Sequence, residues 1–216
     1  MSPDKLFFII QAAKEEELRT GRYVSFLRDK LAQLHLNILI QDDNPINCLF
    51  KFSVEYIEMA PRLIECVEAC AREAHETELF QPFVSTAISY FIHPSAIFSR
   101  YAGLDGMMMK AYLCHRLMEE MYDNNKSIRN SNLVDVEVTQ ANLLAHHLIG
   151  EPFANELDQA TLITMCKLAG SPDYYDLDLN PFVTQAKHRA WEWMHAYWQG
   201  LLERNHIQFQ FSLRHC

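Results

Sequence analysis

Residues 107–123, with the sequence MMMKAYLCHRLMEEMYD, decide the fold class of this chain. Apolar side chains recur there every three or four residues, which is the period of an amphipathic α-helix. His115 and Glu119 lie four residues apart, on one helical line with Met108, Tyr112 and Tyr122. Because that line is largely apolar or aromatic, we expect both polar side chains to face inward or to be half-buried. The stretch therefore predicts a helix that carries a histidine and a carboxylate into a core.

Prolines and polar caps divide the rest of the chain into further helices. Proline is tolerated at the first helical position, where its missing N–H would have no helical partner. We expect about seven helices, over residues 2–39, 43–74, 81–92, 107–123, 135–148, 152–170 and 180–201. Gly150 is expected to end the fifth as a left-handed cap.

Three local features add detail to this predicted series of helices. Pro61 should kink or split the second helix, and the acidic residues 15–17 are expected to form a solvated face of the first. Residues 207–211, IQFQF, alternate as a strand would. Since no second strand is expected, we interpret them as an extended tail that packs on the bundle or on a neighbouring chain. The predicted organisation is a helical bundle over 1–206 and a tail over 207–216.

The composition excludes several classes of function. A chain of 216 residues fits one domain, and its 6 glycines are few for a turn-rich sandwich or barrel. The formal net charge of −9 offers no basic stripe for phosphates, so we expect no nucleic-acid partner. Apolar runs such as 6–10 are too short to span a membrane, and the first residues do not resemble a signal peptide. Six cysteines spread over a core-forming length indicate reduced thiols in a cytoplasmic protein.

Histidine and acidic residues at helical spacings indicate a metal site. Residues three or four apart share one face of a helix, and both can reach an ion at the axis of a bundle. The last helix contains a Glu-x-x-His unit at Glu192 and His195. Imidazole and carboxylate ligands suit iron, manganese or zinc, and iron is our first expectation. The predicted ligands are His75, His115, Glu119, His147, Glu192 and His195.

Interpretations that involve no metal also stay open for these residues. His115 and Glu119 would also suit a hydrogen-bonded pair at a helix interface. Glu192 and His195 share a helical line with His188 and Gln199, which is typical of a solvated face. The pattern also lacks a second Glu-x-x-His unit, which di-iron bundles use.

In length and number of helices the chain resembles the haem-oxygenase-like architecture more than the ferritin-like bundle. No diagnostic motif accompanies this resemblance. It implies a metal-dependent, non-haem iron or di-iron oxidase or oxygenase that acts on a small organic molecule. The alternative is a non-catalytic helical interaction or regulatory protein, which we expect to form a homodimer.

Overall fold

The computed structural model describes residues 4–34, 38–93, 98, 101, 103–131, 136–170, 172–188 and 191–209. These ranges contain ten α-helices, two short 3-10 helices and one two-stranded sheet. The α-helices are α1 (Asp4–Thr20), α2 (Arg22–Leu31), α3 (Pro45–Glu73), α4 (Thr77–Ile92), α5 (Leu104–Asp123), α6 (Lys126–Arg129), α7 (Val136–Ile149), α8 (Phe153–Ala169), α9 (Asn180–His188) and α10 (Trp191–Gln199). The 3-10 helices are η2 (Pro172–Asp176) and η3 (Glu203–Asn205), and the strands are β1 (Ile38–Ile40) and β2 (Ile207–Phe209).

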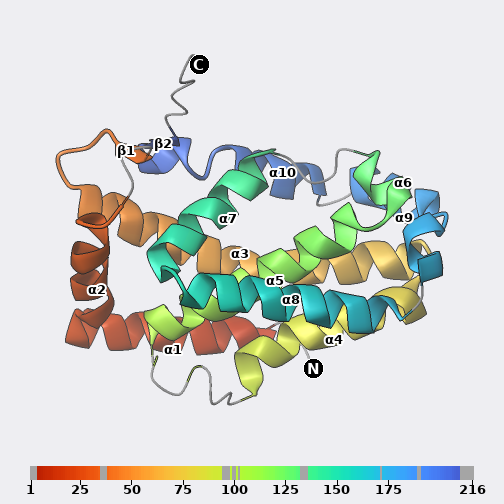
Figure 1. The fold of residues 1–216 in the computed structure, drawn as a ribbon, viewed down its shortest axis with the longest axis horizontal. Helices are drawn as coiled ribbons and strands as arrows, with labels where there is room; N and C mark the ends of the chain where they lie inside the picture. Colours follow the sequence, from red (N-terminus) through yellow and green to blue (C-terminus); the bar gives the residue numbers. More distant parts are fainter. Residues whose placement is uncertain are drawn as a thin grey trace.

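Helix α5 is the centre of the bundle. It contacts α1, α3, α4, α7 and α8, which surround it (Figure 1). Most of its 20 residues are buried, including the expected His115 and Glu119. The inward orientation predicted for these two side chains is therefore confirmed. A polar side chain on α5 has little access to water and must find its hydrogen-bond partners inside the protein.

The N-terminal helix is divided where the sequence predicted one helix over 2–39. Gly21, between α1 and α2, has a φ of 60°, which glycine adopts without steric cost. The carboxylate of Glu17 accepts hydrogen bonds from the backbone N–H groups of Tyr23 (2.7 Å) and Val24 (3.0 Å). These are two of the N–H groups that a helix leaves without an internal partner at its start. Glu17 is only 6% exposed, so the expectation of a solvated face is wrong at this residue.

Two prolines lie inside helices. α3 runs through Pro61 without a break, so the expected split is absent from this described helix. α4 begins at Thr77, four residues before the expected start at Gln81, and contains Pro82 in its second turn. Proline there removes one hydrogen bond close to the helix start, and a buried apolar face keeps the helix together.

The expected tail begins as a paired strand. β2 pairs antiparallel with β1, and Ile38 lies opposite Phe209. β1 occupies residues that the sequence assigned to the end of the first helix, which is why the partner strand was missed. The remainder of the tail, 210–216, lies outside the described residues.

Several expected boundaries are close to those observed. α7 ends at Ile149, and Gly150 follows with a φ of 88°. Gly150 is therefore the left-handed cap that the sequence predicted. α5 starts at Leu104, three residues before the expected start. The expected seventh helix corresponds to α9 and α10, which flank residues 189–190, themselves outside the described part.

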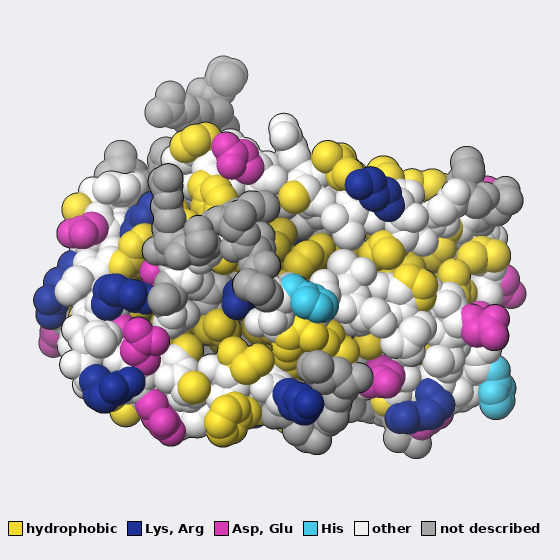
Figure 2. All heavy atoms as spheres, turned by 90° about the horizontal axis from the view of Figure 1, so that it is seen from below, with side chains coloured by type: hydrophobic (Ala, Val, Ile, Leu, Met, Phe, Trp, Pro, Cys, Tyr) yellow, Lys and Arg dark blue, Asp and Glu magenta, His cyan; other side chains and the backbone are white. Residues whose placement is uncertain are grey.

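The all-α class is confirmed in the described ranges, whereas the choice of a haem-oxygenase-like arrangement stays a prediction. None of the described helices combines the length and apolar character that a membrane crossing requires. On the face that Figure 2 shows, the visible basic side chains are interspersed with acidic ones. The five described cysteines are free thiols, and all except Cys166 are buried.

We expect Glu17→Ala to lower the free energy of unfolding by about 2 kcal/mol, because one buried and one partly buried backbone N–H group lose a charged acceptor. Urea unfolding measures this change. Glu15→Ala is the matched control, since Glu15 is exposed and its substitution should change stability by less than about 0.5 kcal/mol. Equal losses in the two variants would show that Glu17 does not cap α2.

Candidate functional site: two cavities that meet at α5

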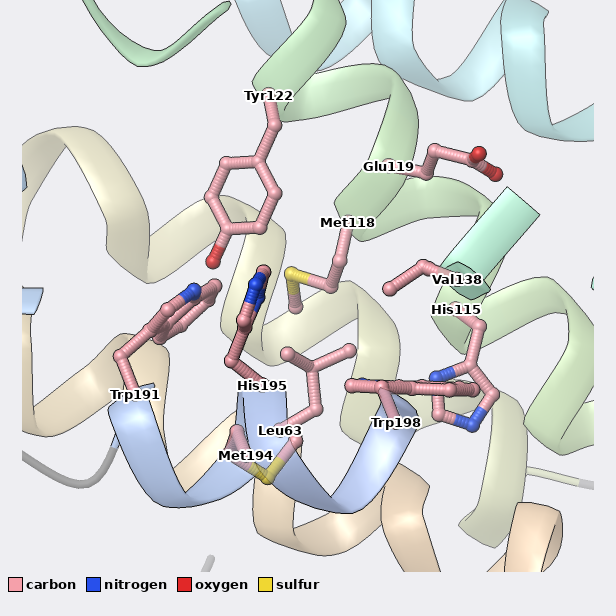
Figure 3. A pocket seen from close by; sticks show the side chains of 10 residues that line it. All are labelled: Leu63, His115, Met118, Glu119, Tyr122, Val138, Trp191, Met194, His195 and Trp198. Atoms are coloured by element: carbon pink, nitrogen blue, oxygen red, sulfur yellow. The ribbon is translucent and has the colours of Figure 1, made fainter. Parts of the chain in front are cut away.

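Two cavities lie on either side of Glu119. The first, which we call the interior cavity, is enclosed between α5 and α10, with contributions from α3 and α7. The second, the polar cleft, lies between α5, α7 and α8 and has a volume of about 260 Å³. Glu119 lines both cavities. The interior cavity is lined by Leu63, His115, Met118, Glu119, Tyr122, Val138, Trp191, Met194, His195 and Trp198 (Figure 3).

The walls of the interior cavity are mainly aromatic and thioether side chains. α10 contributes Trp191, Met194 and Trp198, at spacings of three and four residues that place them on one helix face. Met118 of α5 lies opposite them (Figure 3). The free volume is only about 20 Å³, which is room for roughly one water molecule. Because methionine side chains are flexible, Met118 and Met194 can move to enlarge it.

His115 presents an unpaired nitrogen to this cavity. The side chain is 1% exposed, and its Nε2 lies 2.9 Å from the backbone carbonyl oxygen of Tyr56. A carbonyl only accepts, so Nε2–H donates and Nδ1 carries a lone pair. Nδ1 has no hydrogen-bond partner among the described residues. Burial lowers the pKa of His115 from 6.5 to about 4, so the imidazole is neutral at pH 7.

Tyr122 presents a second unpaired group. Its side chain is 3% exposed, and its hydroxyl has no partner within the described ranges. The ring packs edge to face on Trp191, with 5.2 Å between the ring centroids. Burial raises the pKa of Tyr122 well above its usual value, so the hydroxyl keeps its proton and can donate. Helix α5 therefore offers an acceptor and a donor to the same cavity.

Glu119 is held by hydrogen bonds that turn its carboxylate away from the imidazoles (Figure 3). Its Oε2 accepts from Nδ2 of Asn142 at 2.7 Å, and its Oε1 accepts from the hydroxyl of Thr139 at 3.0 Å. Arg116, one turn earlier on α5, forms an ion pair with the same carboxylate. Asn142 in turn accepts from the hydroxyl of Tyr56 at 2.7 Å. The carboxylate is thus fully engaged although it is only 4% exposed.

The polar cleft is organised around Asp158 of α8. Its Oδ1 accepts from the hydroxyl of Tyr112 at 2.6 Å and from Nε of Arg116 at 3.2 Å. Its Oδ2 lies 3.2 Å from Nδ1 of His146. Arg116 also pairs with Glu120 at 2.7 Å. Burial lowers the pKa of Arg116, but the Glu119 carboxylate more than compensates, and the net direction is upward. The guanidinium therefore keeps its charge and is shared among the carboxylates of Glu119, Glu120 and Asp158.

The predicted metal ligands are brought together only in part. His115, Glu119 and His195 line the interior cavity. Glu192 of α10 is exposed, and neither it nor His147 of α7 lines the cavity. His75 is exposed in the connection between α3 and α4.

The bonds of Glu119 weigh against a metal ion at the cavity. The oxygens of Glu119 already accept from three protein donors, and the guanidinium of Arg116 would repel a cation at the same carboxylate. Nδ1 of His115 is available as a single nitrogen ligand, since Nε2–H donates to a carbonyl as in many metal-binding histidines, but the carboxylate of Glu119 is not free to join it. In the described part of the chain, no three His, Cys, Asp or Glu side chains are grouped to hold a metal.

Sequence reasoning missed most partners of His115, Arg116 and Glu119. Tyr56, Asn142 and Asp158 lie on three other helices, and no local pattern links them to α5. The sequence does indicate the ion pairs of Arg116 with Glu119 and Glu120. Arg116 precedes these residues by three and four positions, the spacings at which helical side chains form ion pairs.

We expect protein purified without a histidine tag from iron-supplemented cells to contain far less than one iron, manganese or zinc per chain. The reason is that Glu119 is satisfied by protein donors and faces away from the imidazoles. Metal analysis of the purified protein measures this. Stoichiometric metal that is lost in Glu119→Gln but kept in Glu192→Gln would contradict the expectation and restore the metal site.

We also expect His115 to make the protein less stable in acid. The unfolded chain takes up a proton at His115 below about pH 6.5, while the folded protein does so only near pH 4. In this interval the unfolded state binds more protons, so the free energy of unfolding falls as pH falls. Between pH 7 and 4.5, His115→Gln should lose about 2 to 3 kcal/mol less than the unsubstituted protein. The control is His188→Gln, at an exposed position, which should follow the unsubstituted protein. Parallel pH profiles for all three proteins would contradict a neutral, buried His115.

No family model, curated protein or solved structure matches the chain. The function is therefore inferred from the interior cavity and the polar cleft themselves.

Proposed function

We propose that the protein binds a small, flat and mainly apolar organic molecule in the interior cavity, without a metal. The observation that carries this proposal is Nδ1 of His115, a buried acceptor that faces the cavity and has no partner among the described residues. A buried polar atom without a partner costs about 1 to 3 kcal/mol, so such atoms are rare unless a water or a ligand meets them.

A single water molecule does not satisfy the whole cavity. His115 and Tyr122 are separated by seven residues on α5, or about 10 Å along the helix axis. The free volume holds roughly one water, which can bind near one of the two groups but cannot reach both. A ligand that extends along α5 can meet both groups after Met118 and Met194 move.

The cavity walls favour a flat, apolar ligand. Trp191, Trp198 and Tyr122 offer ring faces and edges for stacked or edge-to-face contacts. Ligand pockets are commonly of this kind, with mostly apolar walls and a few polar groups that fix orientation.

The protonation states support binding more than acid–base catalysis. A general base is effective when its pKa lies near the operating pH, whereas burial lowers the pKa of His115 to about 4. Glu119 is tied to Arg116, Asn142 and Thr139. Burial raises the pKa of the Cys66 thiol to about 12, and it also raises the pKa of the Cys114 thiol. Neither cysteine is therefore a thiolate at neutral pH.

The other functions expected from the sequence stay predictions. The clustering of His115, Glu119 and His195 at one cavity supports the metal-dependent oxidase of haem-oxygenase-like architecture, and the bonds of Glu119 weigh against it. The homodimeric interaction protein has no specific support from a single chain.

We expect naphthalene, a flat apolar probe, to raise the melting temperature by about 2 to 5 °C in a saturable manner, because it binds the folded state alone. Thermal unfolding followed by circular dichroism measures the shift. Val138→Phe should abolish it, since Val138 is half-buried at the cavity and a larger side chain there fills the space.

The matched control for this experiment is Leu162→Phe, which adds the same ring at an exposed position on α8. This variant should respond to naphthalene as the unsubstituted protein does. The proposal fails if naphthalene causes no saturable shift in the unsubstituted protein, or if Val138→Phe responds equally.

A further inference from the structure

We infer that the ligand of the interior cavity is a neutral, flat heteroaromatic molecule that carries an N–H or O–H donor for His115 and an acceptor for Tyr122. This inference rests on the function proposed above and names the chemical class of the ligand.

The donor requirement follows from the bonds of His115. Because Nε2–H donates to the carbonyl of Tyr56, the face that His115 turns to the cavity can only accept. A ligand carbonyl or carboxylate at this point would place one lone pair against another. An N–H or O–H group would instead complete the hydrogen bonding of a side chain that is 1% exposed.

The ligand is neutral because the cavity walls are mainly apolar and the carboxylate of Glu119 is directed away from the imidazoles. Glu119 is the carboxylate at the cavity, and its oxygens already accept from Arg116, Asn142 and Thr139. An ammonium group beside His115 would lose its hydration, and the carboxylate of Glu119, turned away and engaged by protein donors, would not contact it. An anion would face a neutral imidazole, since His115 is unprotonated at pH 7.

The other end of the ligand is set by Tyr122. Its hydroxyl keeps its proton and lies beside the indole ring of Trp191 (Figure 3). Two turns of α5 separate it from His115, so the ligand carries its acceptor at the end opposite to its donor. His195 lies between Trp191 and Trp198 on the same wall (Figure 3).

Indole and benzothiophene test the donor requirement, because they have nearly the same shape and only indole has an N–H group. We expect indole to bind the unsubstituted protein roughly tenfold more tightly than benzothiophene, the effect of one buried hydrogen bond. In His115→Phe the two probes should bind equally. Tyr122→Phe is the matched control: indole has no acceptor to lose there, so the preference for indole should remain. Isothermal titration calorimetry gives the three comparisons.

A second measurement needs no substitution. In protein labelled with ¹⁵N-histidine, indole should shift the Nδ1 resonance of His115 in the direction of a nitrogen that accepts a hydrogen bond, and benzothiophene should not. If indole, benzothiophene and naphthalene bind with equal affinity and leave this resonance unchanged, the donor requirement is wrong while binding of apolar molecules stands. If none of the three binds, the proposed function itself fails, and the inference with it.

Discussion

The burial of α5 on all sides is the constraint on which the rest of the structure depends. A helix at the surface can turn its polar side chains to water, but α5 is surrounded by α1, α3, α4, α7 and α8. Each polar group on it must therefore be paired within the protein or remain without a partner at a cost in stability. Arg116 and Glu119 meet this constraint through each other and through α7 and α8. Nδ1 of His115 and the hydroxyl of Tyr122 do not meet it within the described residues, and both lie at the interior cavity.

The helical repeat explains why the two cavities differ so strongly in character. Tyr112 and Arg116 lie on the side of α5 that faces α7 and α8, where charged groups gather in the polar cleft. His115, Met118 and Tyr122 lie on the side that faces α10, where tryptophan and methionine side chains gather. Glu119 stands between these two sides. Its bonds to Arg116, Thr139 and Asn142 direct its carboxylate to the cleft, and the walls of the interior cavity are mainly aromatic and apolar. Buried ion pairs add little net stability, so the more definite consequence of this one is the separation of a polar compartment from an apolar one.

The sequence alone predicts those parts of the structure that local patterns determine. The helical class, the end of α7 at Gly150 and the inward orientation of His115 and Glu119 follow from periodicity and from cap residues within a few positions. Features that depend on distant residues were missed. The pairing of β1 with β2 joins residues about 170 positions apart, and Asp158 reaches Arg116 from a different helix. Glu17 was misjudged because an acidic triplet is typical of a solvated face, and only the break at Gly21 shows why one of its members is buried.

An unpaired acceptor in a tightly packed protein has to be explained by something it enables, because replacing histidine by an apolar side chain would remove the cost. Recognition is such a benefit. A site that contains a buried hydrogen-bonding group discriminates strongly against molecules that lack the matching group, whereas an apolar pocket separates similar molecules by little. A histidine whose pKa burial lowers to about 4 is suited to this role, since its acceptor stays unprotonated throughout the neutral range. The same low pKa makes it a weak base. The environment of His115 thus supports the proposed selective binding more than proton transfer, and the aromatic walls around it are suited to flat molecules.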